Sequence, residues 1–264
     1  KLAKAVEASG VQVLSGESAR VIDQDSEGVS IEQGSLRVRA KIVVHADGLA
    51  GLEPTRHYTQ YALLTRARAS RPRPGWAFER FTNEGPLAVL PHPEALGEQS
   101  IVWCCSPERA SALHALAPKD FSQELTEMFG SRLGTLTVDG PVARVPLAMT
   151  LRPHTLDGRC VAIGNAAQTL HPVAGQGLNL GLRDAATLTI ALREWLVTPD
   201  QTPSAALQRY EQLRGPDRQM TVRLTDLLSR VFTTKAPVIE HAAGLALLGM
   251  DLLPALRAPL ARHL

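Results

Sequence analysis

The first forty residues combine one short helical pattern with several strand-like runs. Leu2 and Val6 fall on one side of a helix over residues 1–9, and Gly10 stands where a glycine commonly ends a helix. Alternating apolar positions then recur over residues 11–38, separated by the turn sequences DSEG and QGS. The pattern predicts a helix followed by a β-meander.

A different kind of strand follows at residues 42–44, which are apolar on successive positions. A strand that is covered on both faces requires such a run. It ends in His45, Ala46, Asp47 and Gly48, so the Asp47 carboxylate is expected at the C-terminal end of a strand, where open α/β sheets bind ligands. Asp47 is therefore a candidate site residue, and a simple turn before a glycine is the alternative.

Residues 53–150 show a different pattern of residue types from the preceding segment. Aromatic and β-branched segments, divided by Pro and Gly, predict an antiparallel sheet: HYTQYALLTRA, GWAFERFT, PLAVLPH and QSIVWCC. A helix is expected from about Ser106 to Leu133, lying across this sheet or at its edge. Because the block is inserted between segments with a parallel-sheet pattern, it indicates a second domain.

The α/β pattern returns at Arg159, with an apolar strand over residues 160–163, a glycine-rich loop and a helix from about Gly177 to Val197. Apolar or small residues recur along this helix at steps of four and three, and further apolar residues on its other faces predict that it is buried. The recurring positions are Leu178, Leu182, Ala185, Thr189, Leu192 and Leu196. Residues 204–264 are expected to be largely helical, with segments kinked or ended at Gly215-Pro216, Pro237, Pro254 and Pro259.

The loop sequence GNAAQTLHPVAGQGLNLG, residues 164–181, fits neither of two common phosphate-binding patterns. Its glycines do not match G-x-G-x-x-G, since the third comes one residue late, and no Lys-Ser/Thr pair follows as in a P-loop. What remains is a helix N-terminus with free N–H groups at about residues 177–179, which stabilises negative charge. The loop therefore predicts a site for an electron-rich group; a glycine-rich turn that only packs two elements closely is the alternative.

The composition of the chain argues against a membrane-spanning protein and a nucleic-acid-binding protein. The chain has 264 residues, 44% of them apolar, and no run of about eighteen apolar residues that would span a membrane. Lys and Arg exceed Asp and Glu by only two and are dispersed, so we expect no nucleic-acid partner. Cys104, Cys105 and Cys160 lack metal-ligand spacing and are expected to be reduced thiols in the core. Without an export signal, the default location is cytoplasmic.

Four segments together resemble the FAD-dependent aromatic-ring hydroxylases of the p-hydroxybenzoate hydroxylase type, and among them the ubiquinone-biosynthesis hydroxylases. They are VVHADG at 43–48, GWAFERFTNEGPLAVLPH at 75–92, RCVAIGNAAQTLHPVAGQGLNLGLRDAATL at 159–188 and LQRYEQLRGPDRQMTVRLTDLLSRVF at 207–232. The resemblance covers essentially the whole chain. It implies reduction of FAD by NAD(P)H and transfer of one oxygen atom of O2 to an electron-rich aromatic substrate.

The resemblance also implies roles for individual residues. Asp47 and Gly48 would lie near the FAD pyrophosphate, and Gly164 and Asn165 at the ribityl chain. The backbone from Gly177 to Asn179 would face the flavin N1 and C2 carbonyl and stabilise negative charge there. The cofactor-binding residues expected at this helix start are Gly175, Gln176, Gly177, Leu178 and Asn179. His171 and Pro172 would stand between isoalloxazine and substrate as the catalytic pair.

Several of these residues also have plain structural interpretations. His171 could only shape the loop, and Asn179 could satisfy its own helix backbone. Asp184 is expected to interact with the helix dipole or to pair with Arg183 rather than to catalyse. His92 and Cys104 are expected to be packing residues of the substrate domain.

The chain also departs from the family pattern. Residues 1–60 contain no G-x-G-x-x-G, and Asn165 and Gln168 stand where the family usually has Asp and His, while His45 replaces a small residue. A hydrogen bond from uncharged Asn165 to a ribityl hydroxyl would be weaker than one from Asp. We expect the chain to be a fragment or a natural remnant that binds FAD poorly or not at all by itself and that self-associates through an exposed sheet edge, as a dimer or by strand exchange.

The expected fold class is α/β with an α+β substrate domain: an incomplete Rossmann-like FAD-binding domain interleaved with an antiparallel-sheet substrate domain and C-terminal helices. The expected boundaries are 1–52 and 158–198 for the FAD-binding parts, 53–157 for the substrate domain and 199–264 for the C-terminal helices.

The leading functional hypothesis is hydroxylation of a polyprenyl phenol on the way to ubiquinone, in the cytoplasm or peripheral to the inner membrane. A C-terminal leucine-rich segment could touch a membrane surface or be a plain core helix. It contains Leu252, Leu253, Leu256, Leu260 and Leu264 with Arg257 and Arg262. Hydroxylation of a small aromatic acid is the first alternative and would need a basic residue for the carboxylate: Arg66, Arg68 or Arg80. A non-catalytic scaffold in a hydroxylase assembly is the second.

Overall fold

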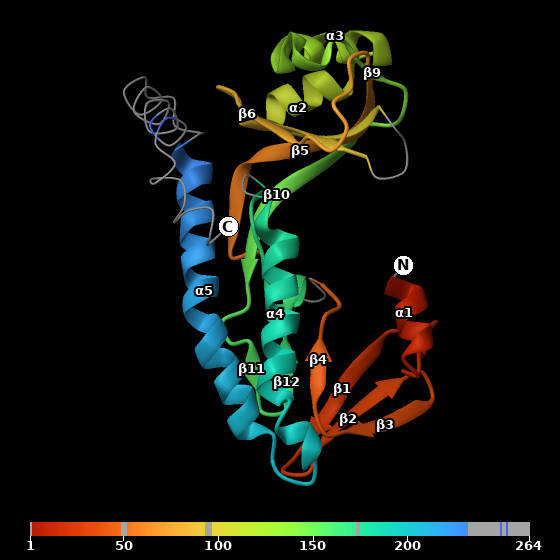
Figure 1. Cartoon of the computed structure of the whole chain (residues 1–264), viewed down its shortest axis with the longest axis vertical. Helices are drawn as coiled ribbons and strands as arrows, with labels where there is room; N and C mark the ends of the chain where they lie inside the picture. Colours follow the sequence, from red (N-terminus) through yellow and green to blue (C-terminus); the bar gives the residue numbers. More distant parts are fainter. Residues whose placement is uncertain are drawn as a thin grey trace.

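The computed structural model describes residues 2–48, 52–92, 97–172 and 175–231, together with Gly249 and Leu252. Mixed helix and sheet elements form the fold, as the sequence predicted (Figure 1). Three sheets are present in the described part of the chain, and the two long helices α4 and α5 run beside one another along it.

The N-terminal elements confirm the predicted helix and meander. Helix α1 spans Leu2–Ala8, and Gly10 follows it with a left-handed φ of 73°. Strands β1 (Ala19–Gln24), β2 (Val29–Gln33) and β3 (Leu36–Ala40) form an antiparallel three-stranded sheet in that order. The apolar residues at 11 and 13 lie outside the strands and are exposed, so the meander begins later than their alternation indicated.

A small sheet brings the two expected α/β segments together. Strand β4 (Val43–His45) pairs in parallel with β12 (Cys160–Ala162), whose other neighbour is the antiparallel β11 (Leu156–Asp157). All three residues of β12 are buried, but the Val44 side chain is 42% exposed. The expectation that residues 42–44 are covered on both faces is therefore wrong, because β4 is the edge strand of this sheet in the described residues.

The predicted antiparallel block forms the largest sheet, and Figure 1 shows its long strands β5 and β10 descending toward α4 and α5. The strand order is β13-β10-β5-β8-β7-β6, with β9 also paired to β5. The bounds are β5 Arg56–Ala69, β6 Phe78–Phe81, β7 Pro86–Pro91, β8 Glu98–Cys105, β9 Leu136–Val138, β10 Ala143–Leu151 and β13 Gln168–Thr169. Through β13 this sheet takes in two residues of the glycine-rich loop segment.

Two helices and a 3-10 turn cover one face of the large sheet: α2 (Pro107–His114), α3 (Pro118–Phe129) and η1 (Ser131–Leu133). The single helix expected over 106–133 is therefore wrong. A proline disfavours helical backbone in the residue before it, and Ala117 is extended with φ −63° and ψ 151°. The largest fully buried side chains between sheet and helices include Leu63, Leu87, Ile101, Trp103, Leu113, Phe121, Leu125, Leu133 and Leu136.

Helix α4 (Gln176–Leu192) exists as predicted, but it ends earlier than Val197 and a separate 3-10 turn η4 covers Trp195–Val197. The predicted apolar stripe does not face the core: Leu178 is 73% and Leu182 60% exposed. The buried face carries Leu180, Asp184, Leu188 and Ala191 instead. The inward stripe contains a charged residue, so apolar periodicity selected the wrong face and the helix is not buried all round.

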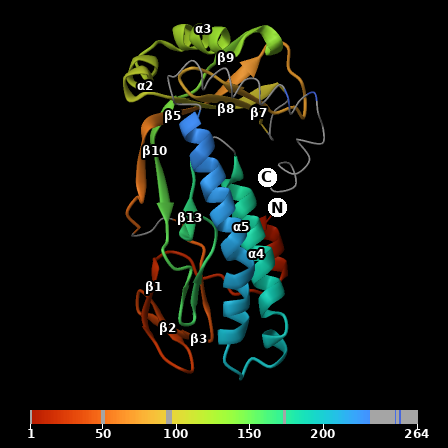
Figure 2. The same cartoon turned by 90° about the vertical axis from the view of Figure 1, so that its left-hand side faces the viewer.

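Helix α5 (Ser204–Val231) lies antiparallel to α4 and packs against it (Figure 2). It continues through Gly215-Pro216, where a kink or an end was expected; the helix does not end there. Pro216 lacks an N–H group, but Arg183 and Arg214 both pair with Asp217 directly after it and fix this turn. Pro237, Pro254, Pro259 and most of the leucine-rich C-terminal segment lie outside the described residues.

The three cysteines are free and buried, which confirms the expected core thiols. Burial raises the pKa of Cys104 to about 12 and that of Cys105 to about 11, so both stay protonated and unreactive at neutral pH. Among the described residues, no helix is both long and apolar enough to cross a membrane.

Candidate functional site

The parallel pairing of β4 and β12 brings two of the predicted site segments to one edge. The Ile163 amide donates to the His45 carbonyl at 2.9 Å, so the segments after the two strands leave the sheet side by side. Gly164 and Gly48 both have left-handed φ values, 58° and 82°, which glycine adopts without strain. The Asp47 and Asn165 side chains are exposed at this edge.

The N-terminus of α4 is open. Gly175 precedes the helix in a left-handed conformation, and no side chain caps the helix. Gly177, Leu178 and Asn179 are exposed, and a Cβ on Gly175 or Gly177 would meet no atom within 4 Å. First-turn amides lack intrahelical acceptors, so their N–H groups can donate to a ligand in this space.

Close approach between the loop and α4 depends on two glycines. The 3-10 turn η2 (Gly164–Ala166) follows β12, and a Cβ added to Gly181 would lie 3.3 Å from the Gly164 Cα atom. Larger residues at either position would push α4 away from the loop. The third glycine of the GQGLNLG sequence therefore serves packing, and the first two leave the helix end open.

The buried Asp184 side chain holds the η2 turn close to α4. Its carboxylate, 2% exposed, accepts hydrogen bonds from the Gly164 amide at 2.9 Å, Gln168 Nε2 at 2.9 Å and Arg214 Nε at 2.8 Å. The expected pair with Arg183 is wrong: Arg183 pairs with Asp217 at 3.0 Å, because adjacent helical residues point in different directions. Asp184 thus anchors the η2 turn and α5 to α4 through its hydrogen bonds.

Two further arginines, which no local sequence pattern marks, donate hydrogen bonds to the loop backbone. Arg152 Nε donates to the Ala166 carbonyl at 3.1 Å, and Arg218 donates to the carbonyls of Arg152 and Ala167 at 2.7 and 3.0 Å. Buried backbone oxygens need donors, and this loop has few ladder partners to provide them. Arg214 and the sequence GPDR at 215–218 show that arginines cluster in this part of the chain. Their partners could not be assigned without the fold.

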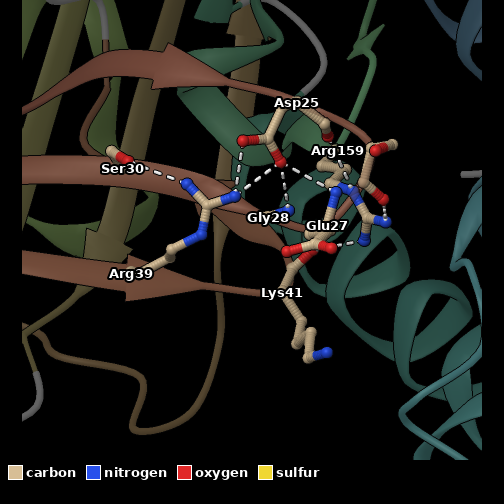
Figure 3. A network of polar contacts seen from close by, with 8 residues as sticks. Asp25, Glu27, Gly28, Ser30, Arg39, Lys41 and Arg159 are labelled. Carbon is tan, nitrogen blue, oxygen red and sulfur yellow. Dashed lines mark hydrogen bonds and ion pairs between the residues drawn. The ribbon is translucent and has the colours of Figure 1, made fainter.

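Arg159, the residue before β12, ties the meander to the small sheet (Figure 3). Its guanidinium is buried and donates to the carbonyls of Asp25, Ser26 and Lys41. In the same turn Asp25 accepts from the Gly28 amide and pairs with Arg39 at 2.5 Å. The β1–β2 turn is thereby fixed against the strand that leads into the glycine-rich loop.

His171 lies where the glycine-rich loop meets the large sheet. Its ring is 2% exposed, packs edge-on against Tyr58 at 4.8 Å between centroids, and places Nε2 3.1 Å from Gln60 Oε1. Gln60 Nε2 donates to the Glu84 carbonyl, so Oε1 must accept and His171 carries its proton on Nε2. Burial lowers the pKa of His171 to about 4, and the imidazole is therefore neutral at physiological pH.

The sequence matches the family model described as FAD binding domain over residues 1–225. The chain belongs to this family. It is 34% identical over 254 residues to ubiquinone hydroxylase UbiL of Rhodospirillum rubrum, covering 91% of this chain and 58% of that protein. It is 30% identical over 237 residues to 3-demethoxyubiquinol 3-hydroxylase of Escherichia coli, covering 83% of this chain and 58% of that protein.

Solved structures show the same fold. OxyS anhydrotetracycline hydroxylase from Streptomyces rimosus matches with a TM-score of 0.69 and 22% identity, covering 99% of this chain and 54% of that one. HpxO of Klebsiella pneumoniae, solved with FAD and uric acid, matches with a TM-score of 0.63 and 16% identity, covering 86% of this chain and 60% of that one. The chain spans between half and two thirds of the length of these relatives. FAD is the cofactor of the family, as the sequence resemblance implied.

The open edge has the features that the flavin end of FAD requires. An isoalloxazine is flat and carries electron density at one edge, and the α4 N-terminus offers uncapped amides beside two positions without side chains. Gln168, one of the expected departures from the family pattern, points inward and donates a hydrogen bond to the buried Asp184 carboxylate. Contacts of the individual predicted residues with the cofactor stay predictions.

Three arginines that could have recognised a carboxylate are engaged elsewhere. Arg66 and Arg68 lie 3.9 and 3.5 Å from the Glu98 carboxylate, and Arg80 donates to the Phe129 carbonyl at 2.6 Å on the helix-covered side of the sheet. Cys104 packs with Ala62 and Leu147, which confirms it as a packing residue. The backbone amide of His92 donates to the Glu98 carbonyl, next to the strand that it follows.

Proposed function

We propose that this chain contributes the flavin-facing and substrate-binding parts of an FAD-dependent, NAD(P)H-using hydroxylase that acts on an aromatic ring. The observation that carries the proposal is the joint opening of the β4 end, the η2 turn and the uncapped α4 N-terminus at one edge of the fold. Bound FAD would supply the redox chemistry, in which NAD(P)H and O2 yield the hydroxylated ring, water and NAD(P)+.

The roles of the chain's own residues follow from their positions. The amides of Gly177, Leu178 and Asn179 would donate to the flavin edge and stabilise negative charge there, which costs no reorganisation because the helix fixes them. Gly164 and Asn165 would lie along the ribityl chain, and Asp47 and Gly48 toward the pyrophosphate. Asp184 would act only by holding the η2 turn in place.

His171 and Pro172 would form the boundary between cofactor and substrate. The neutral imidazole cannot serve as a cationic acid near pH 7, so in this proposal it positions the loop against Tyr58 and Gln60 and shields the reacting centre from water. The sheet face beyond it carries a cluster of Ala62, Cys104 and Leu147, which suits an apolar substrate.

A polyprenyl phenol of ubiquinone biosynthesis is the substrate class that we propose. The names of the two hydroxylase relatives support it, as does the engagement of Arg66, Arg68 and Arg80 with other groups. A small aromatic acid would need a free cation near its carboxylate, so these contacts favour the polyprenyl phenol.

The test is an NAD(P)H oxidation assay on the intact gene product with phenols that differ in ring substituents and prenyl chain. We expect the phenol to increase the rate of NAD(P)H oxidation and to be converted to a product that is heavier by one oxygen atom. The rate increase should be larger for prenylated than for carboxylated phenols. A preparation that binds no flavin would contradict the proposal. Flavin binding without any oxidation of NAD(P)H, whichever phenol is added, would favour the non-catalytic alternative.

A separate titration of this chain with FAD, followed by flavin fluorescence, tests whether the described edge suffices for binding. We expect weak binding, because the edge provides contacts for the flavin end and the sequence contains no G-x-G-x-x-G for the pyrophosphate. Tight stoichiometric binding would show instead that the chain holds the whole cofactor.

A further inference from the structure

A cavity of about 370 Å³ lies beside the side chains that anchor the loop, between α5 and the segment that joins β10 to β11. Figure 1 shows α5 passing beside this segment. The charged side chains that line it are Arg152, Arg214, Arg218, Arg223, Asp184 and Glu211. Four guanidinium groups therefore face two carboxylates.

Three of these arginines lack a carboxylate partner. Asp184 is already occupied by Arg214, Gln168 and the Gly164 amide. No carboxylate of the described residues lies within 4.0 Å of the charged nitrogens of Arg152, Arg218 or Arg223, which distinguishes them from Arg183 and Arg214 nearby. Burial lowers the pKa of Arg218, because desolvation outweighs the opposing effect of the Asp184 and Glu211 charges.

Two of the three arginines are held in place before any ligand arrives. Arg152 uses Nε on the Ala166 carbonyl, and Arg218 uses one terminal nitrogen on the carbonyls of Arg152 and Ala167. The remaining guanidinium nitrogens have no hydrogen-bond acceptor among the described residues that would compete with a ligand. Fixed guanidinium forks match the geometry of phosphate oxygens and lose little side-chain entropy on binding.

We propose that this arginine cavity, defined by Arg152, Arg218 and Arg223, binds a phosphate group, either free or carried by a small nucleotide. The surplus of two positive charges among the lining groups matches a phosphate dianion. The volume exceeds that of an inorganic ion and leaves room for a group attached to it. The site is distinct from the flavin edge and does not depend on the proposed hydroxylase activity.

The position of the cavity gives binding a structural consequence. Arg152 and Arg218 are the same residues that donate to the carbonyls of Ala166 and Ala167, at the end of the η2 turn. A phosphate that holds both guanidinium groups restricts these donors further, and the turn that leads to the flavin edge becomes more rigid. Amide hydrogen exchange at residues 164–168 should slow when the cavity is filled.

Isothermal titration of the chain with inorganic phosphate, inorganic pyrophosphate and ADP tests the proposal without any flavin. We expect saturable binding to one site that weakens as salt is added. Arg223→Gln should weaken it about tenfold, the loss of one charge-assisted hydrogen bond. Arg223 is exposed and has no ion pair with a carboxylate of the described residues, so this variant should fold normally.

Two matched variants make the result specific. Arg73→Gln removes the same charge from an exposed arginine far from the cavity and should leave binding unchanged. Arg223→Lys should recover part of the affinity. Tighter binding of ADP than of pyrophosphate would identify a nucleotide as the ligand, and the reverse order a free phosphate compound. Absence of saturable binding for all three probes, or equal losses in Arg223→Gln and Arg73→Gln, would overturn the proposal.

Discussion

The large sheet and the α4 region are stabilised in different ways. Between the sheet and its covering helices lies an apolar core that includes Trp103, Phe121 and Leu125, all at most 1% exposed. Beneath the glycine-rich loop the centre is polar, with Asp184 and Arg214 buried together, while Leu178 at the helix start is exposed. The apolar core stabilises the sheet and its helices but presents no group to a ligand. The polar centre holds the loop backbone in place and leaves the N-terminus of α4 free for a ligand.

Asp184→Asn should have the largest effect on stability, because it removes the more deeply buried of the two carboxylates that pair with Arg214. Breaking a buried ion pair from one side costs about 3–5 kcal/mol. We expect a loss of that size in the free energy of unfolding, measured by urea denaturation, together with faster amide exchange at Gly164, whose N–H group bonds to this carboxylate.

Asp217→Asn is the matched control for that variant. Asp217 also pairs with Arg214, and with Arg183, but its side chain is 26% exposed, so solvent can replace part of the interaction. Its substitution should cost less than that of Asp184. If the two losses are equal, or if Gly164 exchange is unchanged in Asp184→Asn, the polar centre does not organise the loop.

Leu125→Ala addresses the other side of the comparison. Leu125 is fully buried under the sheet, and truncating a core leucine costs about 2–5 kcal/mol through lost burial and a residual cavity. The expected stability loss is about 3 kcal/mol, without the local increase in Gly164 exchange that Asp184→Asn causes. The Leu116→Ala variant, 38% exposed in the turn between the two helices, should lose much less.

This difference also explains what the sequence could predict. The meander, the antiparallel block, and the strand, loop and helix around residues 160–192 follow from apolar periodicity and turn residues. Periodicity failed on α4, where a charged residue interrupts the buried face: it selected Leu178 and Leu182 because Asp184 does not count as a core residue. The break at Ala117 had a visible cause in Pro118, but the helical pattern on both sides outweighed it.

The candidate site was predictable only in part, for the same reason. The open helix end and the adjacent strand ends follow from glycine positions and from the parallel strand pair. The contacts of Arg152, Arg159 and Arg218 with backbone carbonyls join residues far apart in sequence, and such contacts have no local pattern. The pairing of Asp184 with Arg214 rather than Arg183 depends on α5, thirty residues later in the chain.

The junction between the two regions should make stability depend on pH. The folded pKa of His171, about 4, lies below the ordinary value of 6.5, so the unfolded chain binds a proton first as the pH falls. The contribution of the neutral ring is complete above pH 6.5 and declines toward pH 4. Between about pH 7.5 and about pH 5, we expect His171 to account for a loss of about 2 kcal/mol in the free energy of unfolding.

Urea denaturation of His171→Asn at both pH values isolates this contribution, since Asn does not titrate. The variant should be less stable at neutral pH but should lose about 2 kcal/mol less than the unmodified chain on acidification. His114→Asn replaces an exposed histidine elsewhere in the fold and serves as the control for the exchange of histidine for asparagine. Parallel pH curves for the unmodified chain and His171→Asn would show that the ring is not held neutral by burial.

Gly177→Ala has the smallest expected effect on stability and separates the two explanations of the open helix end. Gly177 is helical, its φ is not left-handed, and a Cβ there would meet no atom within 4 Å. Alanine should therefore stabilise the chain by about 0.5–1 kcal/mol through helix propensity.

If the glycine exists so that a flavin can approach the amides, the methyl group of Gly177→Ala should weaken FAD binding by the intact gene product. Gly215→Ala in α5 lies away from this edge and should leave FAD binding unchanged, although it should not stabilise the chain, because a Cβ at residue 215 would crowd the ring of Pro216 that follows it. Equal FAD affinity in the two variants would mean that the α4 amides do not contact the cofactor.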